Sequence, residues 1–436
     1  MSVLDTGWIV LSENYYFPIR QGENRNILVT GTSGCGKSMS IVEPCILNNY
    51  GSLIIVDPKG SLQRKYAEKL RNEGYQIYHM DLSNPEKSNI GFNPLKDICS
   101  DAEILSLANM IVYADKTRNY GGNVDPYWDQ QATELLSIIL DLAINTQKKK
   151  GKQADLSFVN RYLADLRTEE DNSEFERRIY SVSPNTLSYK LFNRFKRVFT
   201  AERTIACIYS SLENAVGTWS CKEVEEFFKK ESFDITSLAE IPSVLFLKIS
   251  DSDESFYPLC AVIINYFIDR LFKYADSQEN GMCRIPIQFV LDDYSSNIVI
   301  RGLPRYISTC RARNIGMMVI IQALSQLRAM HSDNAQTILN NCGHCVFFGT
   351  LDIDTAKEMS QRLNIPFAEA LSFSKDNVAV FRRGYPPLTD RRYREDELAL
   401  EYNMGQMERK RKQIYRYFAD TRRKKEMEEG HGEMSE

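Results

Sequence analysis

The chain lacks an apolar run long enough to cross a bilayer, and its first residues lack the pattern of a secretory signal. Met1-Ser2-Val3-Leu4-Asp5 has neither a basic start nor a following apolar stretch. We therefore expect a cytoplasmic protein, with any attachment to the cytoplasmic face of the cell membrane made through a partner.

The chain also lacks an excess of positive charge. Its 54 lysines and arginines are outnumbered by 58 aspartates and glutamates, which gives a formal net charge of −4. This balance excludes a surface built for nonspecific binding along duplex DNA, but it leaves room for a local basic channel.

No second cysteine or histidine pair accompanies Cys342-Gly343-His344-Cys345, so a zinc site lacks half of its ligands. As a string, this segment also matches a dithiol redox centre. It leads directly into the apolar stretch Val346-Phe347-Phe348-Gly349. We interpret it as the entry to a core strand.

Short apolar runs separated by longer helical patterns recur along the 436 residues. Near-continuous apolar strands that alternate with helices indicate a parallel sheet covered by helices on both faces, so the predicted fold class is α/β. The expected strands are 26–30, 52–56, 75–80, 244–249, 287–291, 317–321 and 345–348.

The expected strands fall into two blocks, 1–97 and 236–400, which we assign to one discontinuous domain. Residues 98–235 lack such runs, and 101–143 carry apolar residues at three- and four-residue spacing, so this part is predicted to be an inserted all-helical domain. The polar stretch 145–152 is predicted to be an exposed loop. Residues 401–436 form a charged tail, either a solvated helix or a contact for a partner.

A phosphate-binding loop follows the first of these strands. The spacing Gly-x4-Gly-Lys-Ser turns the chain so that backbone N–H groups point at one spot, and a helix after it adds partial positive charge. Lys37 is expected to reach the β- and γ-phosphates, and Ser38 to bind Mg²⁺. The alternative is an ordinary glycine-rich turn. The loop consists of Gly31, Thr32, Ser33, Gly34, Cys35, Gly36, Lys37 and Ser38.

A second acidic element ends the expected strand 287–291. Asp292 and Asp293 follow it at the carboxyl end, where parallel sheets present ligands. Asp292 is the candidate Mg²⁺ ligand, and Asp293 is the candidate for orienting or activating the attacking water. The alternative is that the two aspartates form a helix cap or turn.

Three further residues are candidates for phosphoryl chemistry. Gln322 ends the strand 317–321 and could sense the γ-phosphate, with Gln326 a weaker candidate one turn further on. Arg311 and Arg313 precede that strand, and a guanidinium offered from a neighbouring subunit would stabilise charge on the transferring group. Their alternative is a surface position at a helix end.

These elements, in this order, resemble the type IV secretion coupling proteins, the TraG/TraD-type conjugative DNA-transfer ATPases. Asp57-Pro58-Lys59-Gly60 after a strand, together with Gln322-Ala323-Leu324-Ser325-Gln326-Leu327, is the most specific part of the resemblance. The other matching stretches are 31–38, 54–60, 92–95, 125–128, 292–293, 311–316, 320–327, 338–342 and 383–387.

The resemblance implies a RecA-like domain with an all-helical insertion, ATP and Mg²⁺ as cofactors, and a homo-oligomeric ring, expected to be a hexamer, with sites between subunits. It further implies recruitment of a relaxase–DNA complex or effector proteins to type IV secretion channel components, with single-stranded DNA in the central pore. A pore requires basic groups beside stacking aromatics. The stretch 189–197 has that mixture, although an amphipathic helix is the simpler interpretation.

Three departures from the family pattern stand out. Asp293 takes the place of a usual glutamate, which withdraws the carboxylate by roughly 1 Å and slows hydrolysis unless the backbone compensates. Ser61 takes the place of a usual acidic residue. Most family members begin with transmembrane helices, whereas the loop here starts at residue 31, so we expect either a trimmed chain or a member docked by a partner.

Three functions follow as hypotheses. The first is an ATP-driven motor that couples DNA or nucleoprotein to a conjugation channel. The second is an FtsK/HerA-like pump for duplex DNA, although the chain shows no dedicated DNA-reading module. The third is a non-hydrolysing nucleotide-binding adaptor for secretion substrates, which the Asp293 departure keeps open.

Overall fold

The computed structural model describes residues 7–49, 51–114, 126–167, 173–196, 202–250, 253–294 and 298–394. The predicted charged tail, 401–436, lies outside them, and so does Asp125 of the stretch 125–128. None of the helices in the described ranges is long and apolar enough to cross a membrane.

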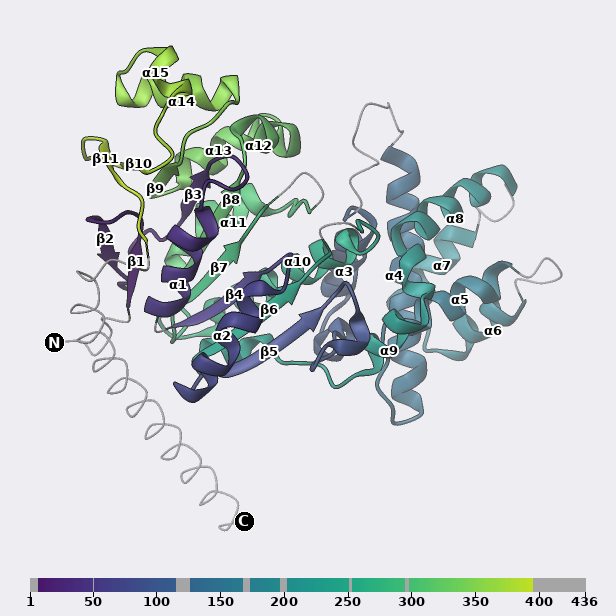
Figure 1. Cartoon of the computed structure of the whole chain (residues 1–436). Coiled ribbons are helices and arrows are strands. Elements are labelled where there is room, and N and C mark those ends of the chain that lie inside the picture. The colour runs from purple at the N-terminus through teal and green to yellow at the C-terminus, as the bar shows by residue number, and fades with distance from the viewer. Residues whose placement is uncertain are drawn as a thin grey trace, which may run out of the picture.

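A nine-stranded sheet forms the centre of the molecule, with strand order β11-β10-β9-β3-β8-β7-β4-β6-β5 (Figure 1). The seven strands from β9 to β5 in this order are parallel, which confirms the predicted α/β class. They are β3 (Ile27–Thr30), β4 (Ser52–Val56), β5 (Gln76–Asp81), β6 (Ser243–Lys248), β7 (Ile287–Leu291), β8 (Ile315–Ile321) and β9 (His344–Phe347).

Four strands were not predicted from the sequence. β10 (Asn377–Arg382) and β11 (Leu388–Arg391) extend the sheet in antiparallel fashion next to β9. β1 (Trp8–Val10) and β2 (Tyr16–Pro18) form a separate antiparallel pair. The segment Arg383-Gly384-Tyr385-Pro386-Pro387 turns the chain between β10 and β11, with Gly384 at a φ of 82°. These strands are short, and the periodicity of so few residues does not separate strand from loop.

Alternate side chains of the central strands enter two different apolar cores. Ile54 and Val56 of β4 belong to the larger core, whereas Leu53 and Ile55 belong to the smaller one. Because both faces of the strand are buried, its sequence is continuously apolar. The smaller core is closed by α1 (Glu43–Asn48) and α2 (Ser61–Asn72).

The larger core lies on the other face of the sheet. Against it pack α10 (Tyr257–Ser277), α11 (Leu303–Thr309), α12 (Leu324–His331) and α13 (Asn334–Asn341). The helices α14 (Ile353–Leu363) and α15 (Phe367–Leu371) precede the β10–β11 hairpin.

The described residues between β5 and β6 form helices joined by turns and loops, with no strand of the sheet among them, and Figure 1 shows a helical bundle beside the sheet. Its apolar side chains form one continuous core with the sheet domain. The division at residues 98 and 235 remains a prediction. The helices are α3 (Asp101–Val112), α4 (Pro126–Lys149), α5 (Ser157–Arg167), α6 (Ser173–Ser181), α7 (Leu187–Phe195), α8 (Glu202–Val216) and α9 (Lys222–Lys229).

The prediction of a loop over 145–152 is wrong for its first half, because α4 continues to Lys149. Buried Gln147 on the last turns packs against the bundle, and tertiary contact outweighs the polar composition. The chain leaves the helix at Lys150, and Gly151 then turns it with a φ of 66°.

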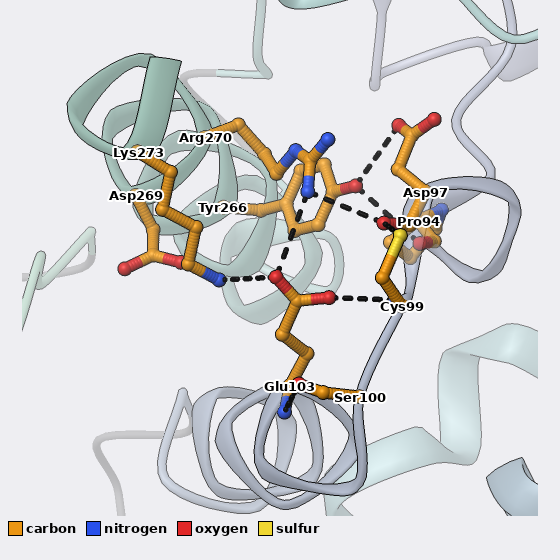
Figure 2. A network of polar contacts seen from close by, with 9 residues as sticks. All are labelled: Pro94, Asp97, Cys99, Ser100, Glu103, Tyr266, Asp269, Arg270 and Lys273. Carbon is orange, nitrogen blue, oxygen red and sulfur yellow. Dashed lines mark hydrogen bonds and ion pairs between the residues drawn. The ribbon is translucent and has the colours of Figure 1, made fainter. Parts of the chain in front are cut away.

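A polar cluster fastens the start of the helical part to α10 (Figure 2). Glu103 of α3 accepts hydrogen bonds from the Cys99 backbone N–H at 2.8 Å and from Lys273 Nζ at 3.0 Å. Arg270 lies 3.8 Å from the same carboxylate, and Lys273 also pairs with Asp269 at 3.0 Å. Each cation in this cluster therefore faces a carboxylate.

Gly316 allows a close approach of side chains at the entry of the central strands. A Cβ added there would lie 2.3 Å from Gln288 Oε1 and 2.7 Å from Cβ of buried Arg25. Arg25 itself is fixed, because its guanidinium donates to the Asn314 carbonyl at 2.6 Å. Gly316 is thus required by packing on both sides.

We expect Gly316→Ala to lower the free energy of unfolding by about 1–3 kcal/mol, because two fixed neighbours must shift. Urea unfolding followed by circular dichroism measures the change. Gly217→Ala is the matched control, since a Cβ at Gly217 would meet no atom within 4 Å. Equal stability of the two variants would contradict this account of Gly316.

Candidate nucleotide-binding site

The phosphate-binding loop lies where the sequence predicts it, between β3 and a helical turn. Residues 31–38 leave β3 and enter the π-helical turn η1 (Ser38–Val42), which continues into α1. Gly36 has a φ of 93°, in the region that glycine tolerates best. The loop lines a pocket of about 310 Å³ together with Asp57, Asp292, Asp293 and Gln322.

The Lys37 ammonium is held inside its own loop. Its Nζ donates to the Gly31 carbonyl at 2.5 Å and to the Thr32 carbonyl at 2.9 Å, and the residue is only 8% exposed. A buried ammonium needs acceptors around it, and these carbonyls supply them. Phosphate oxygens offer the same ammonium stronger, charged acceptors.

The two halves of the predicted metal site meet in this pocket. Asp292 follows β7 directly, and its Oδ2 accepts a hydrogen bond from Ser38 Oγ at 2.8 Å although the residues are 254 positions apart. Burial, together with the neighbouring Asp293 charge, raises the pKa of Asp292 to about 6. A hydroxyl and a carboxylate are oxygen donors of the kind that Mg²⁺ prefers, so this donor pair fits that ion.

Asp293 and Gln322 also come together, from the ends of neighbouring strands. Gln322 Nε2 donates to Asp293 Oδ1 at 3.0 Å, and its backbone N–H donates to Gln326 Oε1 at 3.2 Å. Asp293 has a φ of 51°, a left-handed conformation that is uncommon outside glycine. Such conformations gather at functional sites, where the backbone re-aims a side chain.

The Asp-Pro-Lys-Gly element forms the wall opposite the loop. Asp57 is buried, and its carboxylate accepts from the backbone N–H groups of Ser61 at 3.1 Å and Gln63 at 3.0 Å, so it caps α2. This cap turns Pro58, Lys59 and Ser61 toward the pocket that they line. Lys59 is a further cation at the site, and its place in this motif is the sequence signal for it.

Arg311 and Arg313 are not part of this pocket. They precede β8, whereas Gln322 follows it, and the seven buried residues of β8 separate the two ends by about 20 Å. Arg311 Nε donates to the Gly22 carbonyl at 2.8 Å. Arg313 binds both carboxylate oxygens of Asp276, at 2.8 and 2.9 Å. Their proposed action on a neighbouring subunit stays a prediction.

Arg392 is a site residue that the sequence interpretation missed. It follows β11, and its Nη1 donates to the Cys35 carbonyl at 2.9 Å, against the outside of the phosphate-binding loop. A Cβ at Gly36 would lie 2.6 Å from the same nitrogen, and Arg392 Nε is buried without a hydrogen-bond partner among the described residues. Nothing in the sequence near Arg392 marks it, because the contact spans 357 positions.

The segment Cys342-Gly343-His344-Cys345 has a structural role. His344 begins β9, stacks on Phe17 at 4.2 Å and bonds to the Tyr15 hydroxyl at 3.1 Å. Burial raises the pKa of the Cys345 thiol to about 11. The segment is therefore a strand entry, as the sequence predicts.

The aromatic and basic stretch 189–197 largely forms α7, an amphipathic helix. Phe192 and Phe195 are buried in the bundle core, Arg194 pairs with Glu134 at 2.7 Å, and Lys196 pairs with Glu176 at 2.8 Å. Its aromatic rings and its paired cations are therefore already engaged within the subunit.

Comparison with known proteins places this geometry in a family context. A family model described as "Type IV secretory system Conjugative DNA transfer" matches residues 9–383. VirD4 of Rhizobium rhizogenes is 21% identical over 432 residues, which cover 92% of this chain and 60% of that protein. The conjugal transfer protein TraG of Escherichia coli is 20% identical over 370 residues, covering 81% and 57%. The chain thus spans less than two thirds of the length of these relatives.

Solved structures share the fold. The unbound conjugative coupling protein TrwB aligns with a TM-score of 0.66 at 16% identity, over 89% of this chain and 90% of that one. TrwB in complex with the non-hydrolysable ATP analogue ADPNP aligns with a TM-score of 0.64 at 15% identity, over 89% and 94%. At this identity the likeness establishes the RecA-like architecture with a helical domain.

We expect Arg392→Met to weaken the binding of a labelled adenine nucleotide by about tenfold, because the loop loses a charged hydrogen bond that fixes its shape. A fluorescence titration measures the affinity. Arg391→Met is the matched control, since the Arg391 side chain is 67% exposed and lies 3.9 Å from Glu13. The same loss in both variants would show that Arg392 has no specific role.

Proposed function

Because the chain belongs to the type IV secretory system conjugative DNA transfer family, we propose that it is an ATP-dependent coupling protein. In this role it recruits DNA or a nucleoprotein complex to a type IV secretion channel and drives its transfer. The observation that carries the proposal is the Ser38–Asp292 hydrogen bond, which joins the phosphate-binding loop to the strand-end carboxylate in one pocket.

Different residues of the pocket would bind the phosphates, bind Mg²⁺ and hydrolyse ATP. The backbone amides of residues 31–38 cradle the phosphates, and Lys37 exchanges its carbonyl partners for phosphate oxygens. Ser38 and Asp292 would hold Mg²⁺, which neutralises charge on the phosphates. Burial raises the pKa of Asp292, and a bound divalent cation would favour its ionised form.

Asp293 and Gln322 act on the attacking water and the γ-phosphate. The Gln322 amide holds the Asp293 carboxylate at 3.0 Å, so a γ-phosphate that attracts the amide also releases the carboxylate to accept a proton from water. The left-handed backbone at Asp293 supports the compensation that a shorter side chain in place of glutamate requires.

In a ring of subunits, which family analogy suggests is a hexamer, Arg311 and Arg313 would act on a neighbouring subunit. Arg311 and Arg313 lie at the sheet edge opposite the subunit's own pocket, so they cannot serve that pocket. Their position supports service to the pocket of a neighbour, where a guanidinium stabilises the charge of the transferring phosphoryl group.

The substrates and partners follow from the same assignment. Single-stranded DNA attached to a relaxase, or effector proteins, would pass the ring toward channel components at the membrane. The protein would then act at the cytoplasmic face, held there by a partner.

We expect Mg²⁺-dependent phosphate release that single-stranded DNA stimulates. Lys37→Ala abolishes nucleotide binding and turnover together, because the phosphate-binding loop loses the ammonium that it holds beside the phosphate position. Asp293→Asn keeps the nucleotide affinity but lowers turnover by about 10²-fold or more, since an amide cannot accept the proton. Steady-state phosphate release and a nucleotide titration measure both. Wild-type turnover equal to that of Lys37→Ala would favour the non-hydrolysing adaptor.

Mixing two inactive variants tests whether neighbouring subunits form the ATP site together. An equal mixture of Lys37→Ala and Arg311→Ala subunits should recover activity at roughly a quarter of the ring's sites, where an intact Lys37 meets a neighbour's intact Arg311. The same mixture with Arg313→Ala identifies which arginine acts. Recovery is measured as phosphate release, and a mixture as inactive as its components would contradict action between subunits.

A further inference from the structure

A second pocket, of about 540 Å³, lies at the seam between the helical part and the sheet domain. The end of α3, the middle of α10 and the start of α11 form its walls, so it is distinct from the phosphate-binding pocket. Its polar and aromatic lining comprises Asn109, Tyr113, Asn265, Arg301, Arg305 and Tyr306.

The charge of this seam pocket is positive. Arg301 and Arg305 line it, and no carboxylate is among its lining residues in the described part of the chain. The cluster of Figure 2 is the opposite case, since Lys273 there pairs with both Glu103 and Asp269. In a chain with a formal net charge of −4, two arginines without a carboxylate in the same pocket indicate an anionic ligand.

Both guanidinium groups lie over aromatic rings. Arg301 is 4.3 Å from the ring centre of Tyr113, and Arg305 is 4.9 Å from that of Tyr306. Tyr306 is fixed in place, because it packs edge-on against Phe272 at 5.5 Å and a Cβ at Gly302 would lie 2.5 Å from its ring. Stacked arginine and tyrosine planes are surfaces on which bases stack.

Two amides complete the lining. Asn265 Nδ2 donates to the Ala261 carbonyl at 2.8 Å within α10, which leaves its Oδ1 as the atom able to meet a ligand. Asn109 is exposed at the rim. Amide groups of this kind bond base edges, whereas the guanidinium groups bond phosphates.

We propose that the seam pocket binds a nucleoside phosphate unit of a single DNA strand. Its guanidinium groups match the phosphate charge of that ligand. Its stacked planes match the base, and its amides match the polar edge of the base. The proposal rests on the proposed function, because it assumes that single-stranded DNA is the cargo. It names the residues that would hold the strand.

Hydrogen bonds of Tyr294 lie between this pocket and the proposed site of hydrolysis. Tyr294 follows Asp293, and its hydroxyl accepts a hydrogen bond from the Ile300 backbone N–H at 3.1 Å, directly before Arg301. The same hydroxyl bonds to His331 Nε2 at 3.0 Å, at the end of the helix that begins beyond Gln322. These hydrogen bonds of buried Tyr294 lie between the Asp293–Gln322 contact and the residue that precedes Arg301.

The test is the affinity of the full chain for a fluorescein-labelled oligodeoxythymidylate, measured by anisotropy in a salt series. We expect the double variant Arg301→Ala/Arg305→Ala to bind at least about tenfold more weakly. We also expect the slope of log affinity against log salt to fall by about 0.7 for each phosphate that the variant no longer neutralises. Arg194→Ala is the matched control, since that exposed arginine is paired with Glu134.

Binding of a labelled adenine nucleotide, unchanged in all variants, shows that they are folded. Oligonucleotide affinity and salt slope equal to wild type in the double variant would overturn the proposal and leave the proposed function intact. Failure of the wild-type chain to bind the adenine nucleotide would instead remove the proposed function.

A second experiment distinguishes binding of a DNA strand from binding of a free nucleotide. Thymidine monophosphate is titrated into Lys37→Ala protein, in which the phosphate-binding loop is disabled. If the monophosphate binds and the arginine substitutions abolish only that binding, the pocket is a mononucleotide site, and the DNA assignment is wrong. Loss of oligonucleotide binding without measurable monophosphate binding supports the strand.

Discussion

The hydrogen bond between Ser38 and Asp292 depends on the order of strands in the sheet. β3, β8 and β7 are parallel neighbours, so the phosphate-binding loop, Gln322 and the aspartate pair emerge at one edge. Because only β8 lies between them, β3 and β7 are about 10 Å apart, and the loop after β3 spans that distance to place Ser38 against Asp292. The nucleotide site is in this sense a consequence of sheet topology.

The same topology explains why some cations act at the pocket and others do not. Lys37 and Lys59 stand at the carboxyl edge of the sheet, whereas Arg311 and Arg313 stand at the entry of β8. A subunit can therefore bind nucleotide with its own residues and still lack a guanidinium in the position that phosphoryl transfer favours. In the proposed ring a neighbouring subunit would supply that guanidinium, and hydrolysis would then depend on assembly.

The helical part is joined to the sheet domain in two different ways. On one side, the cluster around Glu103 pairs every cation with a carboxylate and holds the two parts together. On the other side, the seam pocket leaves Arg301 and Arg305 stacked on aromatic rings. This difference between the two joints is consistent with the proposal that the seam pocket binds a DNA strand while the sheet domain binds ATP.

Local patterns in the sequence determined the parallel strands, the phosphate-binding loop and the acidic strand end, because each depends on residues within one short segment. The pairing of Ser38 with Asp292 could be foreseen, because a phosphate-binding loop requires a carboxylate at the end of another strand to hold Mg²⁺. The end of α4 was misjudged, because its polar last turns are held by packing rather than by composition.

Only the tertiary structure decided the positions of Arg392 and of the seam pocket. Arg392 reaches the loop across 357 positions, from a hairpin too short to show periodicity. Arg301, which precedes α11, lies over the ring of Tyr113, which follows α3. Such contacts are set by how strands and helices pack in three dimensions, and no spacing along the chain encodes them.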